Sequence, residues 1–310
     1  MAEKIILDVD PGHDDALAIL LAIASPAIDL QMVSVVAGNQ TLDRTLRNAL
    51  AVVSVSGARH IPVAAGMARP LVRPQIVAGD IHGQTGLDGP PLPEVTLQPA
   101  PEHAVDLIIR ALRQGAGDIW LVPTGPLTNI AMALRIAPDI RAKIKGIVLM
   151  GGAIDFGNTT PAAEFNILCD PEAAHIVFTS GVPLTMIGLD VSHQTQALPG
   201  RRARIAAIGT PMAALVGAWI DFFGDRYREV FGFAGPPLHD PITVAKLIRP
   251  GLVRTEPMHV EIDLSGGPSY GRTLCDRLHA TGKPANANIG VGIDIDGFWD
   301  ILVDAIATYP

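Results

Sequence analysis

The chain has 310 residues, of which 48% are hydrophobic and 17% charged, and its net charge at pH 7 is −8. This composition fits a compact domain with a large buried core and excludes an extended disordered chain. The acidic balance, without any cluster of Lys and Arg, argues against a nucleic-acid-binding surface and against strongly anionic substrates.

Short apolar runs rich in β-branched residues alternate with longer helix-like stretches through the first two thirds of the chain. The strands predicted in this part are residues 5–9, 30–37, 119–122, 147–150 and 184–189. The helices predicted between and after them are residues 14–24, 42–55, 102–114, 128–136 and 171–179. The alternation indicates parallel strands joined by crossover helices on both faces of a sheet, and the continuous apolar strands agree with burial on both sides.

The last third of the chain has a different pattern. Predicted helices here are residues 201–223, 225–231, 241–247 and 298–308, and strands at 258–262 and 288–293 are expected to form a small antiparallel extension. The longest irregular stretch, residues 69–96, is rich in Pro and Gly, and a loop of this length in a compact domain is often functional. We find no linker or repeat. We therefore expect a single α/β domain over residues 1–310, with an open, mostly parallel, Rossmann-like sheet.

Four aspartates gather around the end of the first predicted strand. Asp8 and Asp10 are two residues apart, so their side chains point to the same face of the strand. A Pro-Gly turn follows, and Asp14 and Asp15 then open the next helix, whose N-terminus stabilises negative charge. The carboxylates therefore converge at the carboxyl end of a parallel strand, which is where open α/β sheets bind ligands.

So many like charges are unfavourable without a cation. A single aspartate could act only as a helix cap, but capping needs one acid rather than four. Carboxylate oxygens indicate a hard cation, and no His/Cys set suggests zinc. Ca²⁺ accepts six to eight oxygens in loose geometry and fits best, with Mg²⁺ as the alternative. Phosphatases of the haloacid dehalogenase type also begin with Asp-x-Asp, but their motif continues to a Thr or Ser that this chain lacks.

The run Asp8-Val-Asp-Pro-Gly-His-Asp-Asp-Ala16 resembles the DxDPGxDDA signature of the inosine-uridine-preferring nucleoside hydrolase family. Further motifs of that family follow in the expected order: Val36-Ala-Gly-Asn39, Pro123-Thr-Gly-Pro-Leu-Thr-Asn129, Met150-Gly-Gly152, Ala163-Glu-Phe-Asn166 and Leu238-His-Asp-Pro241. The resemblance covers essentially the whole chain. It implies the nucleoside hydrolase fold and an N-ribosyl hydrolase that cuts ribonucleosides into free base and ribose.

The resemblance also implies a Ca²⁺ site. Its expected ligands are Asp10, Asp15, Asp240 and the carbonyl of Thr124, completed by water and the ribose 2′- and 3′-hydroxyls. A metal lowers the pKa of bound water, and Asp10 is then expected to be the general base for that water. Asp8 has no direct role that the sequence supports.

The ribose is expected to be held by polar side chains. Asp14 and Asn166 would bind the diol, Asn158 and Glu164 the 5′-hydroxyl, while Asn39 orients Asp10. The full set of expected substrate-binding residues is Asp14, Asn39, Met150, Asn158, Glu164, Phe165, Asn166, Tyr227 and Phe231. The surrounding carboxylates stabilise the oxocarbenium-like charge of glycosidic cleavage, and they should repel a 5′-phosphate.

The leaving base needs a proton, and His239 is the expected acid because imidazole donates near neutral pH. His82, in the long irregular stretch, is either an assisting catalytic residue or a structural one. Tyr227 and Phe231 are four apart on one helix face, which fits core packing or a wall of the base pocket. Purine-specific family members tend to place tryptophans around the base. The histidines here point instead to the pyrimidine-preferring or non-specific branch, with uridine, cytidine or inosine as substrates.

Two alternatives stay open. One is a hydrolase of an unusual riboside, and the other is a non-catalytic protein that binds ribose or calcium. The second is disfavoured because Asp10, Asn39 and His239 are all present. We expect a cytoplasmic, nucleoside-salvage enzyme without membrane or nucleic-acid partners, since there is no membrane-length apolar run, no signal peptide, and only two cysteines. The family habit suggests a homotetramer or dimer.

Overall fold

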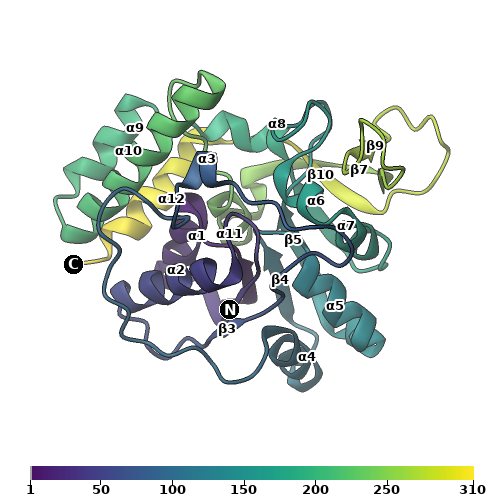
Figure 1. The fold of residues 1–310 in the computed structure, drawn as a ribbon, viewed down its shortest axis with the longest axis horizontal. Helices are drawn as coiled ribbons and strands as arrows, with labels where there is room; N and C mark the ends of the chain where they lie inside the picture. Colours follow the sequence, from purple (N-terminus) through teal and green to yellow (C-terminus); the bar gives the residue numbers. More distant parts are fainter. Residues whose placement is uncertain (1) are drawn as a thin grey trace.

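A computed structural model describes residues 2–310. Met1, which belongs to the N-terminal segment examined for a signal peptide, lies outside the described residues. A sheet of eight strands runs through the molecule in the order β3-β2-β1-β4-β5-β6-β10-β7 (Figure 1). The strands are β1 (Glu3–Val9), β2 (Ile28–Val35), β3 (Val63–Ala65), β4 (Ile119–Pro123), β5 (Ile144–Met150), β6 (Leu184–Ile187), β7 (Val253–Met258) and β10 (Ala287–Ile293). Neighbouring strands are parallel except β10 and β7. The predicted α/β fold with a mostly parallel sheet is confirmed.

Helices cover both faces of this sheet (Figure 1). They are α1 (His13–Ala24), α2 (Leu42–Val55), α3 (Gly79–His82), α4 (Ala104–Gln114), α5 (Thr128–Ile136), α6 (Phe165–Cys169), α7 (Pro171–Phe178), α8 (Leu189–Ser192), α9 (Pro199–Ala207), α10 (Pro211–Phe231), α11 (Pro241–Ile248) and α12 (Ile295–Ala307). Short 3₁₀ turns occupy Pro138–Lys143, His193–Thr195 and Pro250–Leu252. Along β1, Ile5 and Leu7 join one apolar cluster and Ile6 joins the other, as the two-residue period of a strand requires.

The predicted helix over residues 201–223 is wrong, because two helices occupy this region. α9 ends at Ala207, and Gly209 then adopts a φ of +76°. The Thr210 side chain accepts a hydrogen bond from the Ala213 amide at 3.2 Å, and a proline follows it in the first turn of α10. The expected break near Gly224 is absent. There a Cβ would lie only 3.1 Å from Pro236, so the glycine permits close packing within a continuous helix.

The predicted extension over residues 258–262 is also arranged differently. Met258 ends β7, which pairs antiparallel with β10 at the sheet edge. β8 (Val260–Ile262) pairs instead with β9 (Thr273–Cys275), and this two-stranded ribbon projects from the body of the molecule (Figure 1). β7 was missed because only its two end residues, Val253 and Met258, are buried, so it lacks a continuous apolar run.

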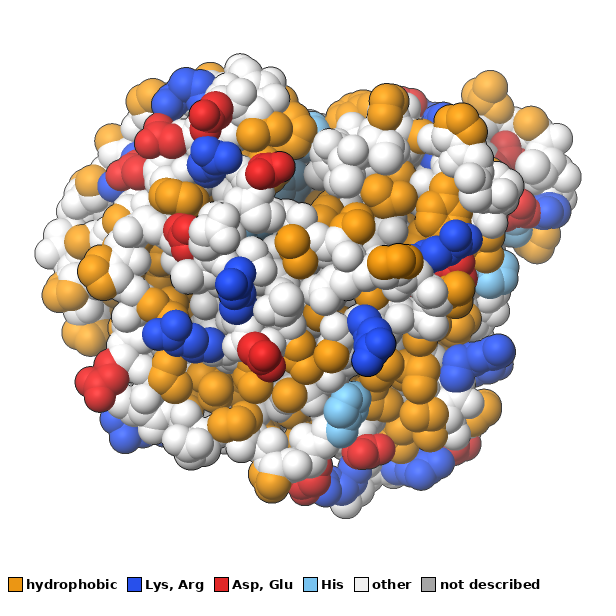
Figure 2. All heavy atoms as spheres, viewed as in Figure 1, with side chains coloured by type: hydrophobic (Ala, Val, Ile, Leu, Met, Phe, Trp, Pro, Cys, Tyr) orange, Lys and Arg blue, Asp and Glu red, His pale blue; other side chains and the backbone are white. Residues whose placement is uncertain are grey.

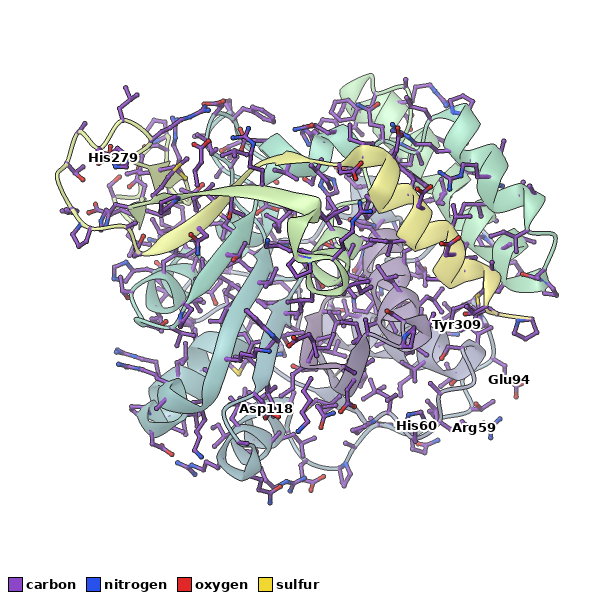
Figure 3. The ribbon with its side chains drawn as sticks, turned by 180° about the vertical axis from the view of Figure 1, so that it is seen from behind. Arg59, His60, Glu94, Asp118, His279 and Tyr309 are labelled. Carbon is purple, nitrogen blue, oxygen red and sulfur yellow. The ribbon has the colours of Figure 1, made fainter. Side chains whose placement is uncertain are left out.

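The C-terminal helix closes the fold against the first helix. The Tyr309 hydroxyl donates to the Leu20 carbonyl at 2.7 Å, and Figure 3 shows Tyr309 beside α1 at the end of α12. α12 and α1 share the apolar cluster that contains Trp299 and Leu17. Within residues 2–310, we find no helix with both the length and the apolar character needed to cross a membrane.

Candidate active site

A cavity of about 240 Å³ opens where the carboxyl ends of β1, β2, β4 and β5 meet, and α3 and α10 close its sides. Figure 2 shows this side of the molecule hollowed near the α9 and α10 region, with histidine atoms at the bottom of the hollow. All but two of the predicted site residues line this cavity. Those that do are Asp14, Asn39, His82, Thr124, Met150, Asn158, Glu164, Phe165, Asn166, Tyr227, Phe231, His239 and Asp240. Asp10 and Asp15, the exceptions, are fully buried.

Strand register brings these residues together. Asp8 of β1 is level with Pro123 of β4, and the Thr124 amide donates to the Asp8 carbonyl at 2.8 Å. On the other side the Val36 amide donates to the Val9 carbonyl at 2.9 Å. The segments that follow β2, β1 and β4 therefore begin side by side at the carboxyl ends of these strands, as expected for parallel strands joined by crossover helices.

Asp14, Asp15 and Asp240 form a buried acidic group in which one oxygen of each lies within 4.8 Å of the others. The Asp15 carboxylate accepts hydrogen bonds from the Gly12 amide at 3.0 Å and from the Thr124 hydroxyl at 2.7 Å. The free amides at the start of α1 thus hold Asp15 in place. The Asp14 carboxylate accepts a hydrogen bond at 3.2 Å from the backbone amide of His239, which is distant in the sequence.

Asp10 has one carboxylate oxygen engaged and one free. Its Oδ2 accepts the Asn39 amide at 2.7 Å, whereas its Oδ1 is buried and has no hydrogen-bond partner among residues 2–310. A Cβ at either Gly38 or Gly125 would collide with this carboxylate, so both glycines are needed for the backbone to approach it. A buried, unpartnered carboxylate oxygen is unfavourable unless a cation or a proton meets it.

Burial and mutual repulsion make these carboxylates hard to ionise. Burial, followed by repulsion from Asp15, raises the pKa of Asp10 well above its ordinary value. The same two causes raise the pKa of Asp14 to about 7, and burial with repulsion from Asp14 raises that of Asp240 well above the ordinary range. A bound cation reverses this balance. The oxygen-only donor set and the unpartnered Asp10 atom therefore fit a hard metal ion.

We expect metal removal to make stability depend on pH. Asp14 titrates near 7 when folded and near 3.8 in an unconstrained chain, so the metal-free folded state binds more protons between these values. Its stability should therefore fall as pH rises through that window. Chelated protein should melt lower at about pH 7.5 than at about pH 5, and added Ca²⁺ should restore the melting temperature most at the higher pH. Equal calcium-induced shifts at both pH values would contradict this.

The residues expected to bind the ribose are held by a network of hydrogen bonds around the start of α6. The Glu164 carboxylate accepts from the amides of Asn166 and Gly152, each at 2.9 Å, and burial raises its pKa to about 7. The Asn166 Nδ2 donates to the carbonyls of Thr124 at 2.6 Å and Met150 at 3.2 Å. Asn166 also lines the cavity, where its side chain can reach a ligand.

A histidine lies between two hydroxyl groups on the other wall. His239 Nε2 is 2.8 Å from the Tyr227 hydroxyl, and its Nδ1 is 2.7 Å from the Ser192 hydroxyl. Burial holds the pKa of His239 well below its usual value, so the ring is neutral at rest. Tyr227 continues into a row of aromatic rings with Phe223 and Phe231, with centroids 4.8 Å and 5.1 Å away. The predicted wall of the pocket thus exists, with Phe223 added to it.

Sequence reasoning missed some residues of the site and left the role of Asp8 open. Phe223 could have been found, because it precedes Tyr227 by four residues on the same helix face. Ser192 carried no signal. Asp8 is not a member of the acidic group. Its Oδ1 accepts hydrogen bonds from Ser34 and, at 2.8 Å, from the Asn129 side chain, and its Oδ2 is buried without a partner among residues 2–310. This supporting position agrees with the absence of a direct role.

A buried acidic pocket at the carboxyl ends of parallel strands is where enzymes with open α/β sheets bind their ligands, and its carboxylates suit a metal ion. The model of the inosine-uridine preferring nucleoside hydrolase family matches residues 5–300, and the chain belongs to this family.

Relatives agree over the full length. The chain is 51% identical over 306 residues to the pyrimidine-specific ribonucleoside hydrolase RihB of Escherichia coli K12, covering 99% of this chain and 97% of the relative. The solved purine-preferring ribonucleoside hydrolase from Gardnerella vaginalis superposes with a TM-score of 0.93 at 35% identity, covering 99% of both chains. A plant nucleoside hydrolase gives 0.92 at 29% identity, also over 99% of both. The nucleoside hydrolase fold is thereby confirmed.

Proposed function

We propose that this enzyme hydrolyses the N-glycosidic bond of ribonucleosides in a Ca²⁺-dependent reaction, with uridine and cytidine as preferred substrates and inosine as a further one. The observation that carries the proposal is the unpartnered, buried Asp10 oxygen beside the acidic group at the floor of the cavity. The pyrimidine preference is supported by the 51% identical relative named pyrimidine-specific. The more distant purine-preferring structure shares the fold, so the pocket wall rather than the sheet must set the base preference.

The sugar and the water would be handled by the acidic side of the cavity. Ca²⁺ held by Asp10, Asp15, Asp240 and the Thr124 carbonyl would supply a Lewis acid that lowers the pKa of water. Asp10 takes the proton from the attacking water, and the Asn39 amide fixes its orientation. The surrounding carboxylates stabilise the positive charge that develops on the ribose.

The remaining polar groups would orient the nucleoside. Asp14 and Asn166 bind the ribose diol, and Glu164 with Asn158 binds the 5′-hydroxyl. His239 supplies the proton for the leaving base. Because its Nε2 faces the Tyr227 hydroxyl, the proton passes to the base through Tyr227 as the C–N bond electrons move onto the base. Burial keeps His239 neutral at rest, so it takes up a proton from solvent when the nucleoside binds and returns to its neutral form once the Tyr227 hydroxyl has passed a proton to the base.

A reducing-sugar assay tests the reaction, the base preference and the charge argument together. We expect ribose from uridine and cytidine, a slower release from inosine, and almost none from the matching 5′-monophosphates, since the carboxylates repel phosphate. Nicotinamide riboside in the same panel tests for an unusual riboside. Equal rates on uridine and its monophosphate would refute the charge argument. A protein that binds ribose and Ca²⁺ but releases no sugar would be the non-catalytic alternative.

We also propose that residues 1–310 act as one domain, and that the enzyme is a cytoplasmic homotetramer or dimer in nucleoside salvage. These proposals rest on the family resemblance. Light scattering on the purified protein measures the assembly, and a monomer at working concentration would refute it. Proteolysis that released a stable fragment would refute the single domain.

A further inference from the structure

Four successive backbone amides in the loop between β5 and α6 donate to side chains rather than to other backbone groups. They belong to Gly152, Ala153, Ile154 and Asp155. The acceptors are Glu164 at the end of the loop, Asp190 in α8 and Thr273 in β9, at distances between 2.7 Å and 3.3 Å. Because a loop has no helix or strand ladder to satisfy its amides, these bonds define the path of its backbone.

Thr273 holds both backbone polar groups of one loop residue. Its hydroxyl accepts a hydrogen bond from the Ala153 amide at 2.9 Å and donates to the Ala153 carbonyl. Thr273 is 2% exposed and Ala153 is 4% exposed, so the loss of this hydroxyl would leave buried backbone groups without a partner. A Cβ at Gly152 would lie 2.7 Å from the Thr273 methyl carbon, so strand and loop are in close contact.

The ribbon of β8 and β9 also contacts the other end of this loop. Gly271, two residues before Thr273, has a φ of +80°. A Cβ at Gly271 would lie 3.1 Å from the Cα atom of Leu168 in α6 and 3.5 Å from the Cβ atom of Ala163. Ala163 directly precedes Glu164. The ribbon therefore lies against both ends of the loop, residues 151–164.

This loop carries the two groups proposed to bind the 5′-hydroxyl of the ribose. Asn158 and Glu164 both line the cavity. The Glu164 carboxylate accepts the Gly152 amide, which is next to the amide held by Thr273. A displacement of Ala153 would therefore reach Glu164 through one peptide unit and one hydrogen bond.

We propose that Thr273 is a positioning residue, through which the projecting ribbon fixes the loop that binds the 5′-hydroxyl of the nucleoside (Figure 1). This inference rests on the proposed nucleoside hydrolysis. Thr273 lies outside the cavity lining, so it acts through Ala153 and not by touching the substrate. Contacts to a part of the substrate remote from the reacting bond can raise the rate, because they hold the reacting atoms in place.

5′-Deoxyuridine, which lacks only the 5′-hydroxyl, separates positioning from general damage in the reducing-sugar assay. The calcium-loaded wild-type enzyme should favour uridine over 5′-deoxyuridine about a hundredfold or more in kcat/KM. Thr273→Val keeps a side chain of similar shape but removes the hydroxyl. We expect its kcat/KM on uridine to fall about tenfold or more, and its kcat/KM on 5′-deoxyuridine to change less than about threefold.

Two further threonine variants serve as controls. Thr273→Ser keeps the hydroxyl and should discriminate between the substrates as the wild type does. Thr281→Val removes a hydroxyl that donates to Asp276 at 2.6 Å, two residues from His279, which Figure 3 shows at the outer end of the ribbon. It should leave kcat/KM unaltered on both substrates. If Thr273→Val does not fold, Thr273→Ala removes the same hydroxyl without a new methyl group, and the same comparison decides.

Equal proportional losses on the two substrates would overturn the inference, since they would indicate general damage. Unchanged rates in Thr273→Val, or a wild-type enzyme that cleaves both substrates equally well, would overturn it too. A wild-type protein that releases no ribose from uridine overturns the proposed reaction instead. Hydrogen exchange over residues 151–158 tests the loop without turnover: exchange should be faster in Thr273→Val than in Thr273→Ser, and equal protection in the two variants overturns the inference.

Discussion

Asp10→Asn is expected to lower kcat for ribose release by about 10³-fold or more while the protein stays folded. The substitution preserves the shape of a side chain that is packed against Gly38 and Gly125, so no atom is added to this crowded point. Its effect is therefore chemical. The variant cannot take a proton from water, and it removes a negative charge from the acidic group.

The hydrogen bonds around Asp10 predict which way the new amide turns. The Asn39 amide donates at 2.7 Å and needs an acceptor, so the asparagine oxygen takes the place of Oδ2. The NH₂ group then occupies the position of Oδ1, the buried oxygen that has no partner within residues 2–310. A donor there repels a cation, so we also expect weaker Ca²⁺ binding, measured by calorimetry.

Asp118→Asn is the matched control for this experiment. Asp118 precedes β4, at the end of the strands opposite the cavity (Figure 3), and it pairs with Lys4 at 2.8 Å. The chemical change is the same, but it occurs at the surface, where exposed ion pairs contribute little. We expect wild-type kcat and Ca²⁺ binding. If Asp10→Asn retained more than about a tenth of wild-type kcat, its role as general base would be refuted.

The sequence predicted the acidic edge of the site because its causes are local. Asp10 follows an apolar strand, and Asp14 and Asp15 open the next helix, so strand and helix periods alone place them near one another. Parallel pairing of β2 and β4 with β1 then brings Asn39 and Thr124 to the same end of the sheet as these aspartates. Short strands and strands without an apolar run gave no such signal. β3 has three residues, and in β7 only the two end residues are buried.

Contacts between distant segments could not be predicted from local patterns. His13 and His82 are 69 residues apart, and the loop that joins them to the Asp88 carbonyl has no periodicity to interpret. Ser192 meets His239 across 47 residues, from a short helix that the sequence did not predict. Such pairings are decided by how helices pack on the sheet. Sequence reasoning therefore identified His82 and His239 as candidates without identifying the side chains that contact them.

His239→Ala is expected to lower kcat on uridine by about 10²–10³-fold, with a much smaller effect on KM. The variant keeps the backbone amide that donates to Asp14 at 3.2 Å, so the acidic group should hold Ca²⁺ as before. What it loses is the imidazole between Tyr227 and Ser192, the group from which the proposed path passes a proton to Tyr227. His60→Ala, a change at an exposed histidine far from the cavity (Figure 3), should leave kcat unaltered.

A substrate with an activated leaving group separates an acid from a structural role. The leaving group of a nitrophenyl riboside is stable as an anion and needs no proton, so an enzyme that lacks only its acid should cleave it almost as fast as the wild type. Tyr227→Phe keeps the aromatic row but removes the hydroxyl 2.8 Å from His239, and it should share this pattern if the proton passes through it. Equal losses on uridine and on the nitrophenyl riboside would show that His239 shapes the pocket rather than protonating the base. Wild-type kcat on uridine in His239→Ala would refute both roles.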